Sequence, residues 1–197
     1  FYLSKKFQNY EIHGYEISPT LVNDAKTIQG LLELSNLIIE KRKLEEIIDS
    51  NKFDIKYSAD VLEHIEQDVL VLQNFYSALK TKGNLILHLP LRYENCNRIF
   101  NWFKKYDTPD HVRDEYIPEE IIAKLNETGF SEINIQYTYS ILTGELAFEL
   151  NNFIHNKRSS YILSQIITLP IVLPLAYLDI YKPHPRGNSM IITAKKE

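Results

Sequence analysis

Short apolar runs typical of strands alternate along this chain with segments whose apolar positions follow the spacing of a helix face. This alternation predicts an α/β domain with a mainly parallel sheet. No internal repeat or low-complexity tract interrupts the pattern. The predicted strands cover residues 11–17, 37–40, 53–61, 84–89, 131–139 and 189–195.

Three predicted helices connect these strands. Ser18 is placed to cap a helix over residues 20–28, and Pro19 suits its first turn. Another helix is predicted over residues 118–128, with Pro118 at its start and Gly129 just past its end. The third, over residues 66–80, has one apolar stripe with the spacing of a helix that packs on a sheet. The members of that stripe are Val69, Leu72, Phe75, Tyr76 and Leu79.

No domain boundary is evident, so we expect a single domain over residues 1–197. Two segments, residues 92–117 and 142–188, fit neither strands nor the helices that connect them, and we interpret them as a cap or inserts. Both follow strands. Open α/β sheets bind their ligands beyond the carboxyl ends of their strands, so these segments are candidates for closing over a site.

Composition narrows the possible partners and location. The net charge is −4, which implies no general attraction to nucleic acid or to acidic membranes. Cys96 is the only cysteine, which excludes an intrachain disulfide and favours a reducing, cytoplasmic location. Residue 1 is Phe, and no charged-then-apolar leader precedes the first predicted element, so we expect the chain to begin at a cut end.

Glu16 is the first candidate for chemistry, because it ends the first predicted strand just before a helix. An acidic side chain at this point can accept hydrogen bonds from both hydroxyls of a ribose, as in nucleotide-binding α/β folds. The alternative is an ordinary solvent-exposed glutamate at the end of a strand.

The second candidate is the stretch Ser58–Ile65, which leaves a strand and enters a helix. Small residues at a strand end leave room for a ligand beside the backbone, and His64 can act as a base or an acid near neutral pH. Alternatively, Glu63 and His64 only flank the start of the helix.

The third candidate is a polar loop over residues 108–116, which contains His111, Arg113 and Tyr116. Loops of this kind near the ligand end of a sheet often close over substrates. The alternative is a solvated charge cluster. We assign no metal site, because the acids around His111 lack a metal-binding spacing. Serine hydrolase chemistry is unsupported, because no Gly-x-Ser-x-Gly elbow is present.

Residues 159–178 hold no charged side chain and reach the minimum length of a membrane-spanning helix. Pro170 and Pro174 would break the hydrogen-bond ladder of such a helix. Three interpretations remain besides a span: core packing, a wall for an apolar substrate, and a contact with a membrane surface or a partner subunit.

Taken together, these segments resemble the class I S-adenosylmethionine-dependent methyltransferases, in the broad group that includes the quinone-biosynthesis enzymes. Residues 14–19 (GYEISP) resemble the second motif of that family, G-x-D/E-x-S-P. Residues 53–54 (FD) and 60–65 (DVLEHI) resemble its FD…DVLEH motif, and residues 79–87 (LKTKGNLIL) its LKPGG-x-L entry to a strand. The motifs stand in the family's order, which makes the set more specific than any one of them.

The resemblance implies that S-adenosylmethionine is the cofactor. It gives Glu16 the role of binding the cofactor ribose and places Ile17 against the adenine. Lys43 stands where the family often has an Asp that contacts the adenine amino group, so Leu44 is expected to supply backbone and apolar contacts there. The residues that would line the methionine part are Ser58, Ala59 and Asp60.

The chain departs from the family at its front. Family members begin with a strand and a G-x-G-x-G loop, whereas residues 1–6 (FYLSKK) resemble the helix after that loop. The missing first strand would lie between the strands that end at Glu16 and Asp60, where an empty slot would leave backbone groups without partners. We favour further residues upstream; the alternatives are that the flanking strands close up or that another chain fills the gap.

We therefore predict a Rossmann-like methyltransferase sandwich with a mostly parallel sheet and an antiparallel hairpin near its C-terminal end. The predicted function is in-line methyl transfer to an unidentified small-molecule, lipid or glycan acceptor. If the acceptor must lose a proton, His111 is the first candidate base and His64 the second, and Arg113 would orient an anionic acceptor. The alternatives are a non-catalytic binding or assembly protein descended from a methyltransferase, and another nucleotide-dependent α/β enzyme such as a nicotinamide-dependent reductase.

Overall fold

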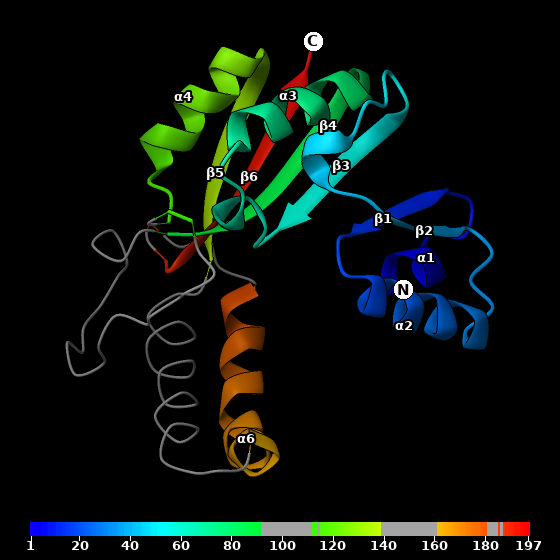
Figure 1. Cartoon of the computed structure of the whole chain (residues 1–197). Coiled ribbons are helices and arrows are strands. Elements are labelled where there is room, and N and C mark those ends of the chain that lie inside the picture. The colour runs from blue at the N-terminus through cyan, green and yellow to red at the C-terminus, as the bar shows by residue number, and fades with distance from the viewer. Residues whose placement is uncertain (92–111, 114, 139–160, 181–184, 186) are drawn as a thin grey trace. The chain divides into compact units, whose positions relative to one another are not determined.

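The computed structural model describes residues 1–91, 112–113, 115–138, 161–180, 185 and 187–197 (Figure 1). These residues form two compact units, Phe1–Asp49 and Ser50–Glu197. Most of the two predicted inserts, residues 92–117 and 142–188, and with them His111, lie outside the described residues.

The first unit contains a two-stranded parallel sheet whose strands are connected by a helix. Ser18 caps that helix: its hydroxyl accepts a hydrogen bond from the Leu21 amide at 3.4 Å. The Asn36 side chain holds the first helix in place by donating to the carbonyl oxygens of Ser4, Phe7 and Tyr10. The elements of this unit are α1 (Tyr2–Lys6), β1 (Ile12–Glu16), α2 (Pro19–Leu31), β2 (Leu37–Lys41) and the 3-10 helix η1 (Leu44–Glu46).

The second unit contains a four-stranded mixed sheet with the order β3-β4-β6-β5. The strands β3 and β4 are parallel, and β6 runs antiparallel to both of its neighbours, as predicted for the C-terminal end of the chain. Neither sheet of the described residues contains both β1 and β3. The elements are β3 (Phe53–Ala59), the 3-10 helix η2 (Leu62–His64), α3 (Asp68–Ala78), β4 (Leu79–Pro90), α4 (Pro118–Thr128), β5 (Phe130–Thr138), α6 (Tyr161–Ile180) and β6 (Ser189–Lys196).

Helices α3 and α4 cover one face of this sheet (Figure 1). On β4, alternate side chains point into the core that they enclose. The fully buried apolar members of this core include Val71, Leu72, Leu85, Leu87, Ile121, Leu125, Met190 and Ile192. Alternate residues along a strand face opposite sides of a sheet, so Ile86 and His88 belong to the other face, where the sheet is only half-buried.

The predicted strands and helices are confirmed with small differences in their ends. Pro118 stands at the start of α4, and Gly129 ends it in the left-handed conformation with φ 102°. Several predicted boundaries are wrong. The strand predicted from residue 84 begins at Leu79, and the helix predicted to residue 28 extends to Leu31. The helix predicted to residue 80 ends at Ala78, because Leu79 already pairs with Phe53 in the sheet. The strand predicted to residue 61 ends at Ala59, because Asp60 has a φ of 50°, which an extended strand cannot contain.

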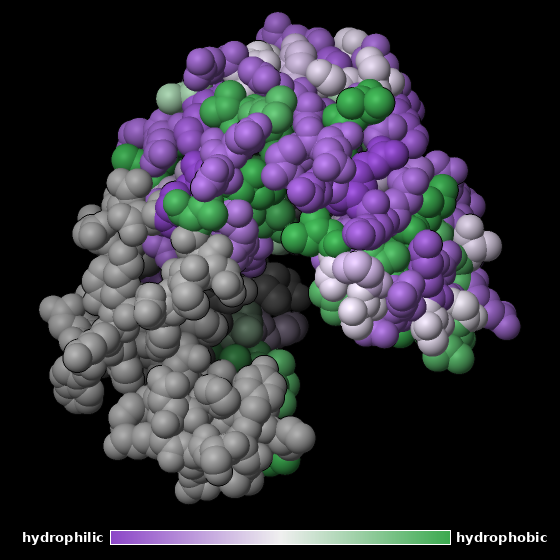
Figure 2. All heavy atoms as spheres, viewed as in Figure 1, coloured by the Kyte–Doolittle hydropathy of each residue, from purple (hydrophilic) through white to green (hydrophobic). Residues whose placement is uncertain are grey.

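Helix α6 continues through Pro170 and Pro174, although neither proline can donate to the hydrogen-bond ladder of the helix. Each proline removes one backbone hydrogen bond, and the four-residue spacing puts both gaps on one edge of the helix. Apolar side chains of α6 are exposed, and the part visible in Figure 2 is coloured as hydrophobic. Of the described helices, none is both long and apolar enough to cross a bilayer.

Gly129 offers a test of this helix end. A Cβ at residue 129 would lie 3.3 Å from the Tyr76 ring, and its φ is one that other residues adopt at a cost of about 1–2 kcal/mol. Gly129→Ala should therefore lower the free energy of unfolding by about that amount, measured by urea denaturation. In the control Gly30→Ala, the added Cβ meets nothing within 4 Å, and stability should be unchanged or higher. Equal effects of both substitutions would contradict this account.

Candidate functional site

Glu16 is held at the carboxyl end of β1 by the turn into α2. One carboxylate oxygen accepts a hydrogen bond from the Ser18 amide at 2.8 Å, and the Glu16 carbonyl accepts one from the Arg42 amide at 3.1 Å. No described residue donates to the second carboxylate oxygen. Ile17 beside it is 63% exposed. The carboxylate is thus oriented by its own loop, with one oxygen available to a ligand and an apolar side chain next to it.

A cluster of three side chains lies near this strand end within the same unit. The Tyr15 hydroxyl donates to Asp49 at 3.4 Å, and an Arg42 guanidinium nitrogen lies 3.3 Å from the same Asp49 oxygen. Burial, followed by the charges of Asp49 and Glu40, raises the pKa of the Tyr15 hydroxyl to about 12. Tyr15 is therefore a hydrogen-bond donor at neutral pH. Leu44 follows in η1 and is half-buried.

In the second unit, the predicted residues Ser58, Ala59 and Asp60 lie where β3 ends, and they differ in burial. Ser58 is buried beneath the helices, whereas Asp60 is exposed where the chain leaves the sheet. The Asp60 amide donates to the carbonyl of His88 at 3.0 Å, and an Asp60 carboxylate oxygen lies 2.9 Å from Nδ1 of His88. Sequence reasoning missed His88. The apolar run of residues 84–89 gives no signal that distinguishes it, because its partner Asp60 follows a different strand.

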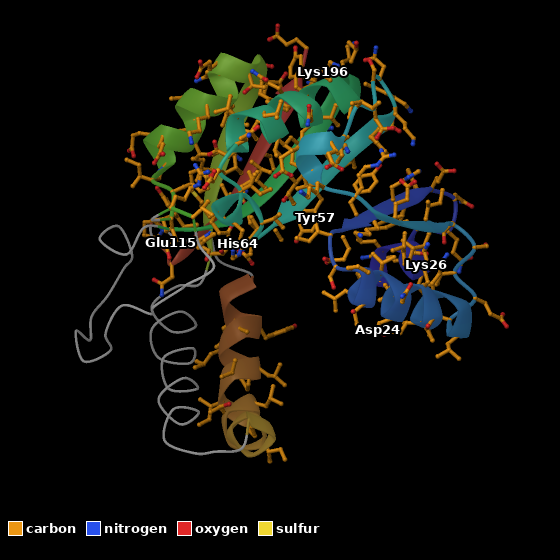
Figure 3. All side chains as sticks on the ribbon, viewed as in Figure 1. Asp24, Lys26, Tyr57, His64, Glu115 and Lys196 are labelled. Atoms are coloured by element: carbon orange, nitrogen blue, oxygen red, sulfur yellow. The ribbon has the colours of Figure 1, made fainter. Side chains whose placement is uncertain are left out.

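His64 is exposed in the short helix η2, at the end of the sheet where β3 terminates (Figure 3). Glu63 beside it is buried, with 1% of its surface exposed, and no described residue forms a hydrogen bond with one of its carboxylate oxygens. Burial raises the pKa of this carboxyl; the charge of Asp60 raises it further, and His64 and His88 lower it. Glu63 is therefore a buried acid that interacts electrostatically with Asp60, His64 and His88.

The side chain of Arg113 forms its hydrogen bonds with other residues of the protein. Its guanidinium donates to Asp68 at 2.7 Å and to the carbonyl oxygens of Ile65 and Glu66. The same Asp68 oxygen accepts hydrogen bonds from the Tyr116 hydroxyl at 2.6 Å and from Lys124 at 2.5 Å. These contacts join the segment before α4 to the start of α3. An anionic acceptor at Arg113, as the sequence predicted, would have to share the guanidinium with Asp68.

Electrostatics explain why Asp68 stays ionised although it is buried. Burial alone would raise the pKa of its carboxyl, but hydrogen bonds from Lys124 and Tyr116 and the charges of Lys124 and Arg113 outweigh it and lower the pKa. The pKa of the Tyr116 hydroxyl is raised far above its usual range by burial and by Asp68. Among the described residues, no group of acids, histidines and cysteines has an arrangement that could hold a metal ion.

Comparison with known proteins identifies the family of this chain. Residues 1–139 match the family model described as a methyltransferase domain. No curated protein matches the sequence.

The solved structures with the same fold include methyltransferases of low sequence identity. Phosphoethanolamine N-methyltransferase 2 from Haemonchus contortus, with phosphomonomethylethanolamine and S-adenosylhomocysteine, has a TM-score of 0.66 and 19% identity over 98% of this chain. A protein from Galdieria sulphuraria, thought to be a sarcosine dimethylglycine methyltransferase, has a TM-score of 0.66 and 14% identity over the whole chain. The chain spans 45% of the Haemonchus protein and 73% of the Galdieria protein.

The Asp68 network yields a stability prediction. Asp68→Asn leaves Arg113 and Lys124 without their shared carboxylate and should cost about 3 kcal/mol at neutral pH, measured by urea denaturation. The pKa of Asp68 is lower in the folded state than its usual value near 4, so its ionised form stabilises the folded protein above that pH. The stability difference between wild type and variant should therefore shrink as pH falls below about 4. As a control, Asp54→Asn removes an exposed pair with Lys80 and should change stability by less than about 1 kcal/mol. Equal costs in both variants would contradict the prediction.

Glu63 should show the opposite pH dependence. Its pKa is raised above 4.5 in the folded state, so its ionisation reduces stability as pH rises through the raised value. Compared with the wild type, Glu63→Gln should gain relative stability as pH rises over the range above 4.5, the usual pKa of the carboxyl. Parallel stability curves for the two proteins, measured by denaturation across this range, would contradict the assignment.

Proposed function

Because the chain belongs to the family of methyltransferase domains, we propose that it transfers a methyl group from S-adenosylmethionine to a small-molecule, lipid or glycan acceptor. The observation that carries the proposal is Glu16. It ends a parallel strand with one carboxylate oxygen bound to the Ser18 amide and the other open to a ligand. That is the arrangement that binding of ribose hydroxyls requires.

The family resemblance assigns individual residues to different parts of this cofactor. In the first unit, Glu16 would bind the ribose, and the exposed Ile17 with Leu44 would contact the adenine. In the second unit, Ala59 and Asp60 would line the methionine part, with Ser58 buried behind them. The open oxygens of Glu16 and Asp60 suit the hydroxyl groups and the ammonium group of such a ligand.

The chemistry assigned to the protein is mainly positioning. The bound cofactor supplies an activated methyl group, because its sulfur is positively charged. The protein must then hold the acceptor in line with that methyl group and exclude water. A base is needed only for an acceptor that must lose a proton. His64 is exposed at the strand end and suits the role of that base. His111 lies outside the described residues, so its role as a base stays a prediction.

Helix α6 and the net charge bear on which acceptor or partner the protein binds. The exposed apolar side chains of α6 support contact of residues 159–178 with an apolar acceptor, a membrane surface or a partner subunit. Their members include Ile166, Leu169, Leu173 and Tyr177. The net charge of −4 supports a partner other than nucleic acid. A cytoplasmic location stays a prediction that rests on the single cysteine.

Calorimetric titration with S-adenosylhomocysteine tests the proposal. Glu16→Gln keeps an oxygen for the Ser18 amide but removes the negative charge, and it should weaken binding by about 1–3 kcal/mol, the scale of one charged hydrogen-bond partner. Glu127→Gln removes a carboxylate from an exposed position on α4 and should bind as the wild type does. Absence of binding by folded wild-type protein would overturn the proposal.

A further inference from the structure

His88 lies on the sheet face that α3 and α4 leave uncovered. Its neighbours Leu87 and Leu89 are buried under the helices, so the imidazole points to the opposite side. The register between the two parallel strands pairs Ala59 with His88. Asp60, the next residue, therefore leaves the sheet directly beside the ring of His88.

Two hydrogen bonds connect Asp60 to His88. The Asp60 amide donates to the His88 carbonyl at 3.0 Å, and Nδ1 of His88 lies 2.9 Å from one Asp60 carboxylate oxygen. The histidine side chain is 15% exposed, whereas that of Asp60 is 57% exposed. A shielded ring thus holds one oxygen of an exposed carboxylate, and no described residue donates to the other oxygen.

The other ring nitrogen of His88 lies near Thr138. Nε2 of His88 lies 3.4 Å from the hydroxyl of Thr138 at the end of β5. A hydroxyl can donate to Nε2, whereas the ionised carboxylate of Asp60 can only accept from Nδ1. The contact with the Asp60 carboxylate therefore requires a hydrogen on Nδ1.

The backbone of Asp60 also needs a fixed partner. Its φ of 50° lies in the left-handed region, which residues other than glycine enter at an energetic cost. Such conformations persist where the surroundings hold them, and they cluster at ligand-binding sites. The two bonds to His88 provide that hold.

We propose that His88 is a positioning residue, which holds one oxygen of Asp60 so that the other faces the α-ammonium group of S-adenosylmethionine. The inference rests on the proposed function for the identity of the ligand. A carboxylate binds an ammonium group more strongly when it is already oriented, because its side chain then loses less conformational entropy on binding.

A matched pair of variants isolates the hydrogen bond. In His88→Asn, the amide nitrogen takes the place of Nδ1 and can still donate to Asp60. In His88→Leu, the side chain has nearly the shape of Asn but has no donor. Two ligands separate the effect from general damage: S-adenosylhomocysteine carries the α-ammonium group, and 5′-methylthioadenosine lacks the whole amino-acid part.

Calorimetry on the full chain should give a selective loss. His88→Leu should bind S-adenosylhomocysteine about tenfold more weakly than the wild type, the scale of one charge-assisted hydrogen bond, with unchanged affinity for 5′-methylthioadenosine. His88→Asn should retain the affinity for both ligands. Asp60→Asn should show the same selective loss as His88→Leu, which keeps the test open if the leucine variant does not fold.

Other outcomes would overturn the inference. If folded His88→Leu and Asp60→Asn weaken both ligands equally, or weaken neither, His88 does not orient Asp60 toward the ammonium group. A loss in His88→Asn as large as that in His88→Leu would show that the ring matters for its packing. Wild-type protein that binds neither ligand would overturn the proposed function itself, and this inference with it.

Discussion

The parallel register of β3 against β4 is the constraint on which the candidate site of the second unit depends. Pairing of Ala59 with His88 puts the ends of both strands at one edge of the sheet. Asp60 can then form a backbone bond and a side-chain bond to the same histidine. A shift by one residue would turn His88 into the helix-covered core and separate the two groups. The antiparallel strand β6 supports this register from the other side of β4.

Local signals explain why most elements were predictable from the sequence. The cap at Ser18, the proline at the start of α4 and the left-handed Gly129 act within a few residues of their own positions. Strand ends were less predictable because they depend on partners elsewhere in the chain. Leu79 continues the apolar stripe of α3, yet it belongs to β4 because Phe53 pairs with it. Local propensity indicated a helix there, and strand pairing overrode it.

The contacts of the candidate site could be predicted only in part. Glu16 follows from a short motif, because its function depends on the end of one strand and the next turn. Asp68 could not be found in this way, since its partners Arg113, Tyr116 and Lys124 are more than forty residues distant in the sequence. His88 lies inside an apolar run and resembles any other strand residue until the neighbouring strand is placed beside it. Sequence patterns identify residues at strand ends, whereas contacts across the sheet require the structure.

The distribution of acids in the second unit separates structural from ligand-facing roles. Asp68 is buried and has cationic and hydroxyl donors, so its charge is balanced within the protein. Glu63 is buried, no described residue forms a hydrogen bond with one of its oxygens, and burial raises its pKa and so disfavours its ionisation. Asp60 alone among these three is exposed, oriented by a neighbour and open at one oxygen. An ionised carboxylate beside solvent, held in advance, is the member of this set that can attract a cationic ligand at low cost. An ionised Glu63 would repel Asp60 and weaken its hydrogen bond to His88, so the burial that raises the pKa of Glu63 also protects the charge of Asp60.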